Sequence, residues 1–202
     1  FNGIDNNAYF NNKNCLDDRV KKWNIELKPW KKEYKKNITI CLQNTKAAHW
    51  PFSYDCNQWV QKTVHNIRKY TKRKIIIRPH PAKPEKINTS NLYNTEIDFT
   101  HKKSIEDVDF INVINNSWCI INVSSNPAIQ SAIYGIPIFT SNNSLACSVS
   151  NLENYSKIEN PSTFDRTQWI NNLSYCEWSI EEIKSGIVWN HLKTYFNSKD
   201  QQ

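Results

Sequence analysis

The sequence has no methionine, no pair of cysteines in a C-x-x-C spacing and no long apolar run. A membrane-spanning helix needs about 20 predominantly apolar residues, so no membrane span is expected. The missing methionine, absent even at position 1, indicates a processed chain or a piece of a longer one. Residues 1–14 also lack a basic start followed by an apolar core. No signal peptide is therefore predicted, and a cytoplasmic location is expected.

The six cysteines stand far apart and form no Cys/His cluster with the spacing of zinc ligands. We expect reduced, structural thiols. Arginine is also scarce, since it provides only five of the 26 basic residues that give the chain its net charge of +7. A basic protein rich in tryptophan and tyrosine can bind nucleic acid. The same excess of lysine, asparagine and isoleucine is typical of an AT-rich genome, so both explanations stay open.

Short apolar runs rich in β-branched residues alternate with helical patterns along the middle of the chain. The runs predict buried parallel strands at residues 38–42, 74–78, 96–99, 118–123 and 136–139. Helical spacing is present between them, at 56–70, from Ser104 onward and at 128–134, where Gly135 closes the helix. This alternation predicts an α/β fold with a doubly wound, Rossmann-like parallel sheet.

Three segments are expected. Residues 1–37 are predicted to form an N-terminal arm or linker with a short helix from Asp17 to Trp23. Residues 38–160 form the Rossmann-like domain, and residues 161–202 form C-terminal helices, at 165–173 and 179–195, that pack on it. The length of 202 residues allows one such domain with appendages and is too short for two.

Two segments that follow predicted strands carry the chemistry. Arg78-Pro79-His80-Pro81 comes directly after a strand, and its two prolines fix the backbone around the imidazole. An arginine beside a rigid histidine can hydrogen-bond and neutralise a diphosphate. A structural turn capped by His80 is the alternative.

The second segment, Ser124-Ser125-Asn126-Pro127, lies between a predicted strand and the start of a helix. Hydroxyl groups and free backbone N–H groups at that position can bind an anion, or Ser125 can simply cap the helix. Because ligands of parallel sheets bind at the carboxyl ends of the strands, both segments are expected at one site.

The order of a strand, R-P-H-P at 78–81 and S-S-N-P-A-I-Q-S-A-I-Y-G-I-P at 124–137 resembles the donor domain of GT-B glycosyltransferases. Sialyltransferases, Kdo-transferases and capsule-polysaccharide transferases with "HP" and "SS" motifs are the most similar types, and teichoic-acid glycerophosphotransferases are similar in the same places. The resemblance covers roughly residues 38–140. It implies that His80, Ser124 and Ser125 contact the donor phosphate. Arg78 and Asn126, which belong to the same two segments, are further candidate phosphate contacts.

The resemblance also implies a ribose contact five residues before the glycine of G-x-P. Many relatives have a glutamate there, whereas this chain has Gln130, which hydrogen-bonds but carries no charge. Asp107-Val108-Asp109 fits the D-x-D pattern of metal-dependent GT-A enzymes, but it lies at a predicted helix start rather than after a strand. GT-B enzymes normally need no bound metal, so neither a metal nor a cofactor is expected.

The loop after the first predicted strand should face the same cleft. Gln43, Thr45 and Lys46 are candidate contacts for donor phosphate or sugar. His49 is a candidate general base, because an inverting transfer needs a base near the acceptor hydroxyl. Packing of His49 beside Trp50 in a surface loop is the alternative.

The predicted function is therefore the transfer of a sugar from a nucleotide-activated donor to an acceptor hydroxyl. The expected partners are a nucleotide sugar, an acceptor glycan or a modified base in DNA, and a missing partner domain or a second copy of the chain. The alternatives are a nucleic-acid-binding module without catalysis, and a glycerophosphotransferase or sugar-nucleotide epimerase.

Overall fold

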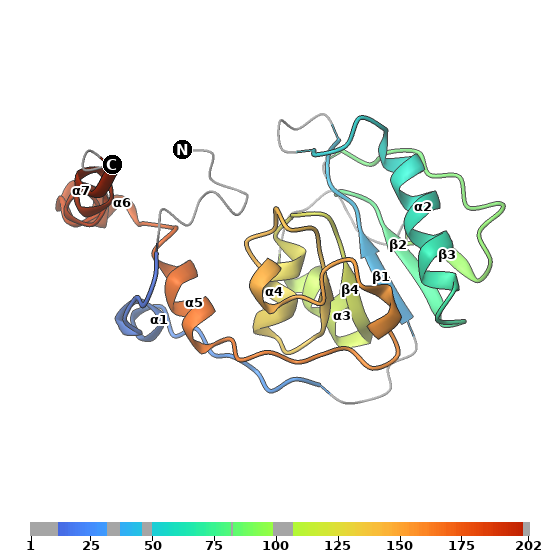
Figure 1. Ribbon diagram of the computed structural model, residues 1–202, viewed down its shortest axis with the longest axis horizontal. Coiled ribbons are helices and arrows are strands. Elements are labelled where there is room, and N and C mark those ends of the chain that lie inside the picture. The colour runs from blue at the N-terminus through green and yellow to red at the C-terminus, as the bar shows by residue number, and fades with distance from the viewer. Residues whose placement is uncertain (1–11, 32–36, 46–49, 82, 99–106, 200–202) are drawn as a thin grey trace.

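Five short parallel strands form one sheet in the order β3-β2-β1-β4-β5. A computed structural model describes residues 12–31, 37–45, 50–81, 83–98 and 107–199 (Figure 1). The strands are β1 Asn37–Cys41, β2 Lys74–Arg78, β3 Thr95–Ile97, β4 Ser117–Ile121 and β5 Ile138–Phe139. The predicted doubly wound, Rossmann-like sheet is confirmed. β5 is shorter than the run at 136–139 because Pro137 has no N–H, although its carbonyl accepts a hydrogen bond from Ile120.

Helices cover both faces of the sheet. Helix α2 (Cys56–Arg68) packs on one face, and α3 (Asp107–Asn116) and α4 (Pro127–Ile133) pack on the other (Figure 1). The Asp55 side chain caps α2 by accepting a hydrogen bond of 2.8 Å from the Gln58 N–H. Because side chains alternate along a strand, Ile38 and Ile40 pack under α2, whereas Cys41 packs under α3 and α4. Both faces are therefore buried, as the continuous apolar strands predict.

Helix α4 is closed by Gly135, and the N-terminal arm packs against this glycine. Gly135 has a φ of +75°, and a Cβ atom built on it would lie 2.0 Å from the Pro29 carbonyl oxygen. The arm is held there by backbone hydrogen bonds from Lys28 N to Ile133 O (2.9 Å) and from Lys31 N to Gly135 O (2.7 Å). Arg166 joins the same place, because its guanidinium donates to the Ala132 and Lys28 carbonyls and lies over the Trp30 ring.

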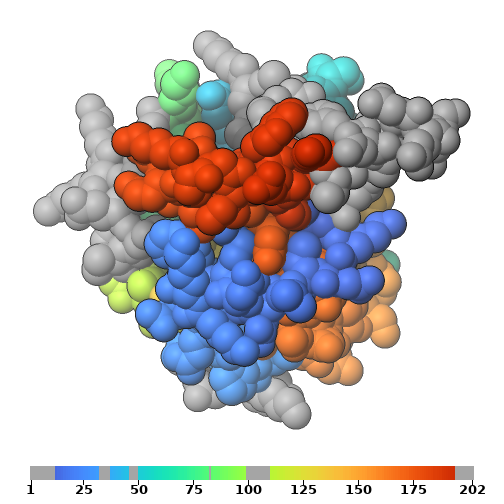
Figure 2. All heavy atoms as spheres, turned by 90° about the vertical axis from the view of Figure 1, so that its left-hand side faces the viewer, coloured from blue at the N-terminus to red at the C-terminus, as the bar shows by residue number. Residues whose placement is uncertain are grey.

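The helices from the two ends of the chain lie side by side (Figures 1 and 2). Helix α1 (Asp18–Lys22) packs on α5 (Thr167–Ser174), and the short α6 (Ile180–Lys184) follows. The prediction of one helix over 179–195 is wrong. Gly186 adopts a φ of +79° and separates α6 from α7 (Ile187–Lys199). The predicted capping box of Ser179 and Glu182 is present at the start of α6.

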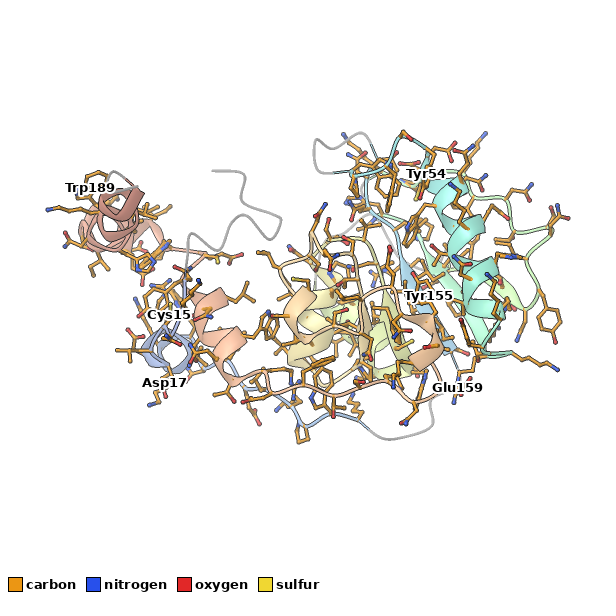
Figure 3. The ribbon with its side chains drawn as sticks, viewed as in Figure 1. Cys15, Asp17, Tyr54, Tyr155, Glu159 and Trp189 are labelled. Carbon is orange, nitrogen blue, oxygen red and sulfur yellow. The ribbon has the colours of Figure 1, made fainter. Side chains whose placement is uncertain are left out.

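Two 3₁₀ helices, η2 (Cys147–Val149) and η3 (Tyr155–Lys157), connect β5 to this helical layer. Tyr155 of η3 packs between α2 and Phe139 of the sheet (Figure 3). All six cysteines are free thiols, and burial raises the pKa of Cys41 and of Cys56 to about 12. Within the described residues, no helix combines the length and apolar character needed to cross a bilayer.

A buried ion pair joins α1 to α6. Arg19 Nη1 donates to Glu182 Oε1 at 2.6 Å, and both side chains are about 6% exposed. Lys22 Nζ reaches the same oxygen at 2.7 Å, and Arg19 Nε donates to the Ser174 carbonyl at 2.7 Å. The Arg19 guanidinium also lies 3.9 Å from the centre of the Trp178 ring. The contacts therefore bind the two chain ends together through one carboxylate.

The Glu182 carboxylate should make the stability of the fold depend on pH. Hydrogen bonds from Lys22, then Arg19 and the Ser179 N–H, lower the pKa of Glu182 to about 2. A lowered pKa stabilises the fold above the unfolded pKa of about 4.3, and that contribution disappears as the pH falls toward 2. We expect Glu182→Gln to lower the melting temperature at pH 7 and to converge with the parent protein near pH 2. Circular dichroism melts across this range test the prediction, and parallel curves would contradict it.

Candidate functional site

A row of polar side chains lies where the strands end. Arg78 is the last residue of β2 and pairs in register with Cys41 of β1. Ile40 pairs with Ile121, and Ile121 with Phe139. The next residues along each strand, Cys41, Asn122 and Thr140, therefore stand at one level. Since neighbouring strands are about 4.8 Å apart, the row from Arg78 to Thr140 spans roughly 15 Å.

The side chains of this row share one face of the sheet. Cys41 belongs to the core under α3 and α4, and alternation along the strands places Arg78, Asn122 and Thr140 on the same side. Gln43, two residues beyond Cys41, follows on this face as well. We name Gln43, Arg78, Asn122 and Thr140 the carboxyl-edge row. Each is less than 9% exposed.

Every member of the carboxyl-edge row keeps a polar atom without a hydrogen-bond partner. Among the described residues, the buried unpaired side-chain atoms are Gln43 Nε2, Arg78 Nη1, Asn122 Oδ1 and Thr140 Oγ1. Such an atom costs about 1–3 kcal/mol when nothing pairs with it, so folded proteins contain few. Here all of them gather at one edge of one sheet. Three are able to donate hydrogen bonds, and none belongs to a carboxylate.

Gln43 and Ser124 bridge the point where the strand order reverses. From β1, the chain builds β2 and β3 on one side, whereas β4 and β5 lie on the other. Gln43 Oε1 accepts hydrogen bonds from the Ser124 N–H (3.1 Å) and hydroxyl (3.4 Å) across this boundary. Ligands of doubly wound sheets bind at this boundary. Ser124 is only 3% exposed, so its visible role is to hold the β4–α4 turn in place.

Ser125, the residue after Ser124, is held by the side chain of Asn122. Asn122 Nδ2 donates to the Ser125 carbonyl (2.7 Å) and hydroxyl (3.0 Å). The alternative of simple helix capping by Ser125 is wrong, because α4 begins after Asn126 and no side chain caps its first turn. Ser125 is half-buried and Asn126 is exposed, so these two residues present the turn to solvent.

Arg78 and His80 mark the end of β2. The Arg78 guanidinium lies 5.0 Å from the centre of the Phe110 ring of α3. His80 closes a turn, because the Lys83 N–H reaches both the His80 carbonyl (3.2 Å) and its Nδ1 (3.3 Å). An Nδ1 that accepts leaves the proton of the neutral imidazole on Nε2. Burial, followed by the charge of Lys83, lowers the pKa of His80 and favours this neutral form.

Three predicted contacts have other surroundings than the carboxyl-edge row. Gln130 and Asn126 line a pocket of about 710 Å³ on the outer side of α4. Its other walls are α1, α5 and the segment before α6, with Trp23, Trp178 and Arg19 among the lining residues. Thr45 is bound through its N–H and hydroxyl to Glu85 of the loop after β2.

Several predicted residues are not described. His49 and Lys46 lie outside the described residues, and nothing tests their predicted roles. Asp107 begins α3, whose side chains are described only from Phe110 onward. In the described part of the chain, no cluster of histidine, cysteine and acidic side chains has the arrangement of a metal site.

Sequence reasoning missed two members of the carboxyl-edge row, Asn122 and Thr140. Asn122 was included in the strand predicted at 118–123, although β4 ends at Ile121. Each is the first polar residue after a buried apolar run, and that position is the signal that could have identified it.

Comparison with known proteins shows similarity in fold only. No protein-family model matches the sequence, and no curated protein matches it. Among solved structures, the fold is similar to KpsC, a β-Kdo 2,7-transferase from Thermosulfurimonas dismutans, with 11% sequence identity and a TM-score of 0.44. The match covers 85% of this chain and 54% of that protein, so the chain spans about half the length of the transferase.

Proposed function

We propose that this chain binds a nucleotide-activated sugar at the carboxyl-edge row and transfers the sugar to an acceptor hydroxyl. The observation that carries the proposal is the unused hydrogen-bonding capacity of Gln43, Arg78 and Thr140 along the carboxyl edge of the sheet, on both sides of its reversal point. A guanidinium, an amide N–H and a hydroxyl together favour a ligand rich in anionic oxygen atoms. A diphosphate has this chemistry.

The reaction would use these donors on the leaving group. The oxygen of the acceptor hydroxyl attacks the anomeric carbon, the bond from that carbon to the phosphate oxygen breaks, and the nucleoside diphosphate, or the nucleoside monophosphate of a CMP-linked donor, leaves with the bonding electrons. Arg78 and the neutral Nε2–H of His80 would stabilise the negative charge that develops on the diphosphate. The proton of the acceptor passes to a general base, for which His49 is our candidate.

The pocket beside α4 is our proposed place for the nucleoside. It begins at Asn126, immediately after the Ser124-Ser125 turn, and its volume of about 710 Å³ lies in the usual range for small-molecule sites. Gln130 offers an amide to the ribose hydroxyls, and the exposed Trp23 offers a ring face to the base. The diphosphate would then extend from this pocket toward the carboxyl-edge row.

Titration with UDP-, GDP- and CMP-linked sugars tests the proposal. We expect one nucleotide class to raise the melting temperature, since a ligand at 100 times its Kd adds about 2.7 kcal/mol of stability. Ser125→Ala and His80→Ala should each reduce that shift, whereas Lys72→Ala, an exposed residue at the opposite edge of the sheet, should not. Failure of every donor to bind would refute the proposal. Analysis of the products then separates sugar transfer from glycerophosphate transfer and from epimerisation.

A further inference from the structure

A second surface lies on the outer side of α2, away from the carboxyl-edge row. Lys62, His65 and Lys69 are exposed and spaced three and four residues apart, which places them on one side of the helix. Lys72 continues the line just after the helix. We name these four residues the α2 basic stripe. Helix α2 contains no acidic residue, and in the described structure none of the three lysines pairs with a carboxylate.

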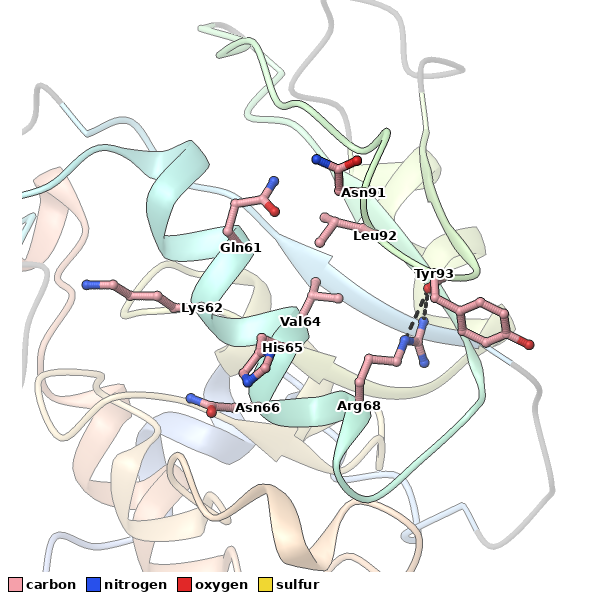
Figure 4. A pocket seen from close by; sticks show the side chains of 9 residues that line it. All are labelled: Gln61, Lys62, Val64, His65, Asn66, Arg68, Asn91, Leu92 and Tyr93. Carbon is pink, nitrogen blue, oxygen red and sulfur yellow. Dashed lines mark hydrogen bonds between the residues drawn. The ribbon is translucent and has the colours of Figure 1, made fainter.

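The stripe borders a groove of about 590 Å³ between α2 and residues 91–93 (Figure 4). The residues that line the groove include Lys62, His65 and Arg68, together with the amides of Gln61, Asn66 and Asn91, and none of them is acidic. On the other side of the stripe, Glu153 shares a second pocket with Lys62 and Lys69. The Lys62 ammonium lies on that second side, 3.7 Å from the centre of the Tyr54 ring. The groove itself therefore holds the Arg68 guanidinium and several amides, and the lysines of the stripe border it.

Tyr93 forms an exposed and well-anchored wall of this groove. Arg68 donates to the Tyr93 carbonyl through Nη2 (2.8 Å) and Nε (3.1 Å), as Figure 4 shows, and its Nη2 also reaches the Asn94 carbonyl (3.1 Å). The guanidinium lies 5.6 Å from the centre of the Tyr93 ring. The ring is nevertheless 68% exposed. An aromatic ring open to solvent on an anchored backbone is able to stack on a planar group.

We infer that this surface binds single-stranded nucleic acid. Proteins that bind single strands combine a positive groove that follows the phosphates with aromatic side chains that stack on the bases. The α2 basic stripe runs about 10 Å from Lys62 to Lys69, which is long enough to meet the phosphates of neighbouring nucleotides. Tyr93 provides the stacking face beside the groove, and Tyr70, at 50% exposure, lies on the other side of the stripe. This surface is separate from the proposed donor site, and the inference does not depend on it.

Fluorescence anisotropy with a labelled oligothymidine tests the inference. Lys62→Gln/Lys69→Gln should weaken binding at low salt by about tenfold and reduce the salt slope by about 0.7 for each phosphate that the variant no longer neutralises. Tyr93→Ala should weaken binding by about 5- to 100-fold and leave that slope unchanged. The matched control Lys13→Gln/Lys184→Gln removes the same charge from exposed positions in the helical layer and should bind like the parent protein.

Two results would overturn the inference. Equal weakening by the two lysine pairs would mean that net charge alone attracts the strand. Binding of polysialic acid as tight as that of oligothymidine, with no effect of Tyr93→Ala on either, would assign the groove to an acidic glycan. Melting temperatures of all variants, and their shifts with nucleotide sugars, are measured in parallel. If a variant loses oligothymidine binding but its melting temperature still rises with nucleotide sugars as in the parent protein, this surface is separate from the donor site.

Discussion

Replacing Arg78 with alanine should weaken the binding of the nucleotide donor by about 30-fold or more. Removing one partner of a buried, charge-assisted hydrogen bond costs about 2–5 kcal/mol, and Arg78 carries the formal positive charge in the carboxyl-edge row. Isothermal titration with the donor class that binds the parent protein measures the loss. The fold should persist, because Arg78 Nη1 has no hydrogen bond to lose and the contact with the Phe110 ring is one interaction at the edge of the core.

Arg78→Lys provides the matched comparison. Lysine keeps the charge but lacks the planar set of donors that suits phosphate oxygens. The donor affinity of Arg78→Lys should therefore lie between that of the parent protein and that of Arg78→Ala. If Arg78→Ala binds as tightly as the parent protein while remaining folded, the diphosphate does not lie at this row. The proposed function would then lose its main support.

Gly135→Ala should destabilise the fold by about 3–5 kcal/mol, among the largest effects expected of a single substitution. The new Cβ would lie 2.0 Å from the Pro29 carbonyl oxygen, which belongs to backbone and is held by its neighbours' hydrogen bonds. Relief of this clash requires the arm to move away and the bonds at Lys28 and Lys31 to break. The positive φ adds strain for any residue other than glycine. Urea denaturation gives the free energy of unfolding.

A Gly186→Ala substitution separates the effect of the steric clash from the effect of the positive φ. Gly186 has nearly the same backbone conformation, with a φ of +79°, but no atom lies within 4 Å of a Cβ built there. Its substitution should therefore cost only about 1 kcal/mol, the conformational part of the effect. Similar losses at the two glycines would mean that the arm does not pack on Gly135 as described.

The sheet could be predicted because its signals are local. A buried parallel strand reads as a short run of β-branched apolar residues, and β2 at Lys74–Arg78 matches its predicted range. The break between α6 and α7 was missed because glycine inside a helical pattern is often tolerated. Its φ of +79° became visible only in the structure.

The site could be predicted only in part, for a physical reason. Arg78, Ser124 and Ser125 follow apolar runs, so their place at the carboxyl edge follows from the sequence. The contact between Gln43 and Ser124 spans 81 positions and depends on β1 and β4 being neighbours, which no local pattern specifies. The same order of strands brings Asn122 and Thr140 to the level of Arg78.

The contacts of Arg19 have a consequence for how the molecule opens. They tie a helix near the start of the chain to carbonyls and a carboxylate more than 150 positions later. Neither α1 nor α6, at five residues each, is long enough to persist alone in water. We therefore expect α1, α5 and α6 to behave as one cooperative unit that opens before the sheet does. Because this unit also forms walls of the 710 Å³ pocket, its opening would expose that pocket and the nucleoside proposed to lie in it.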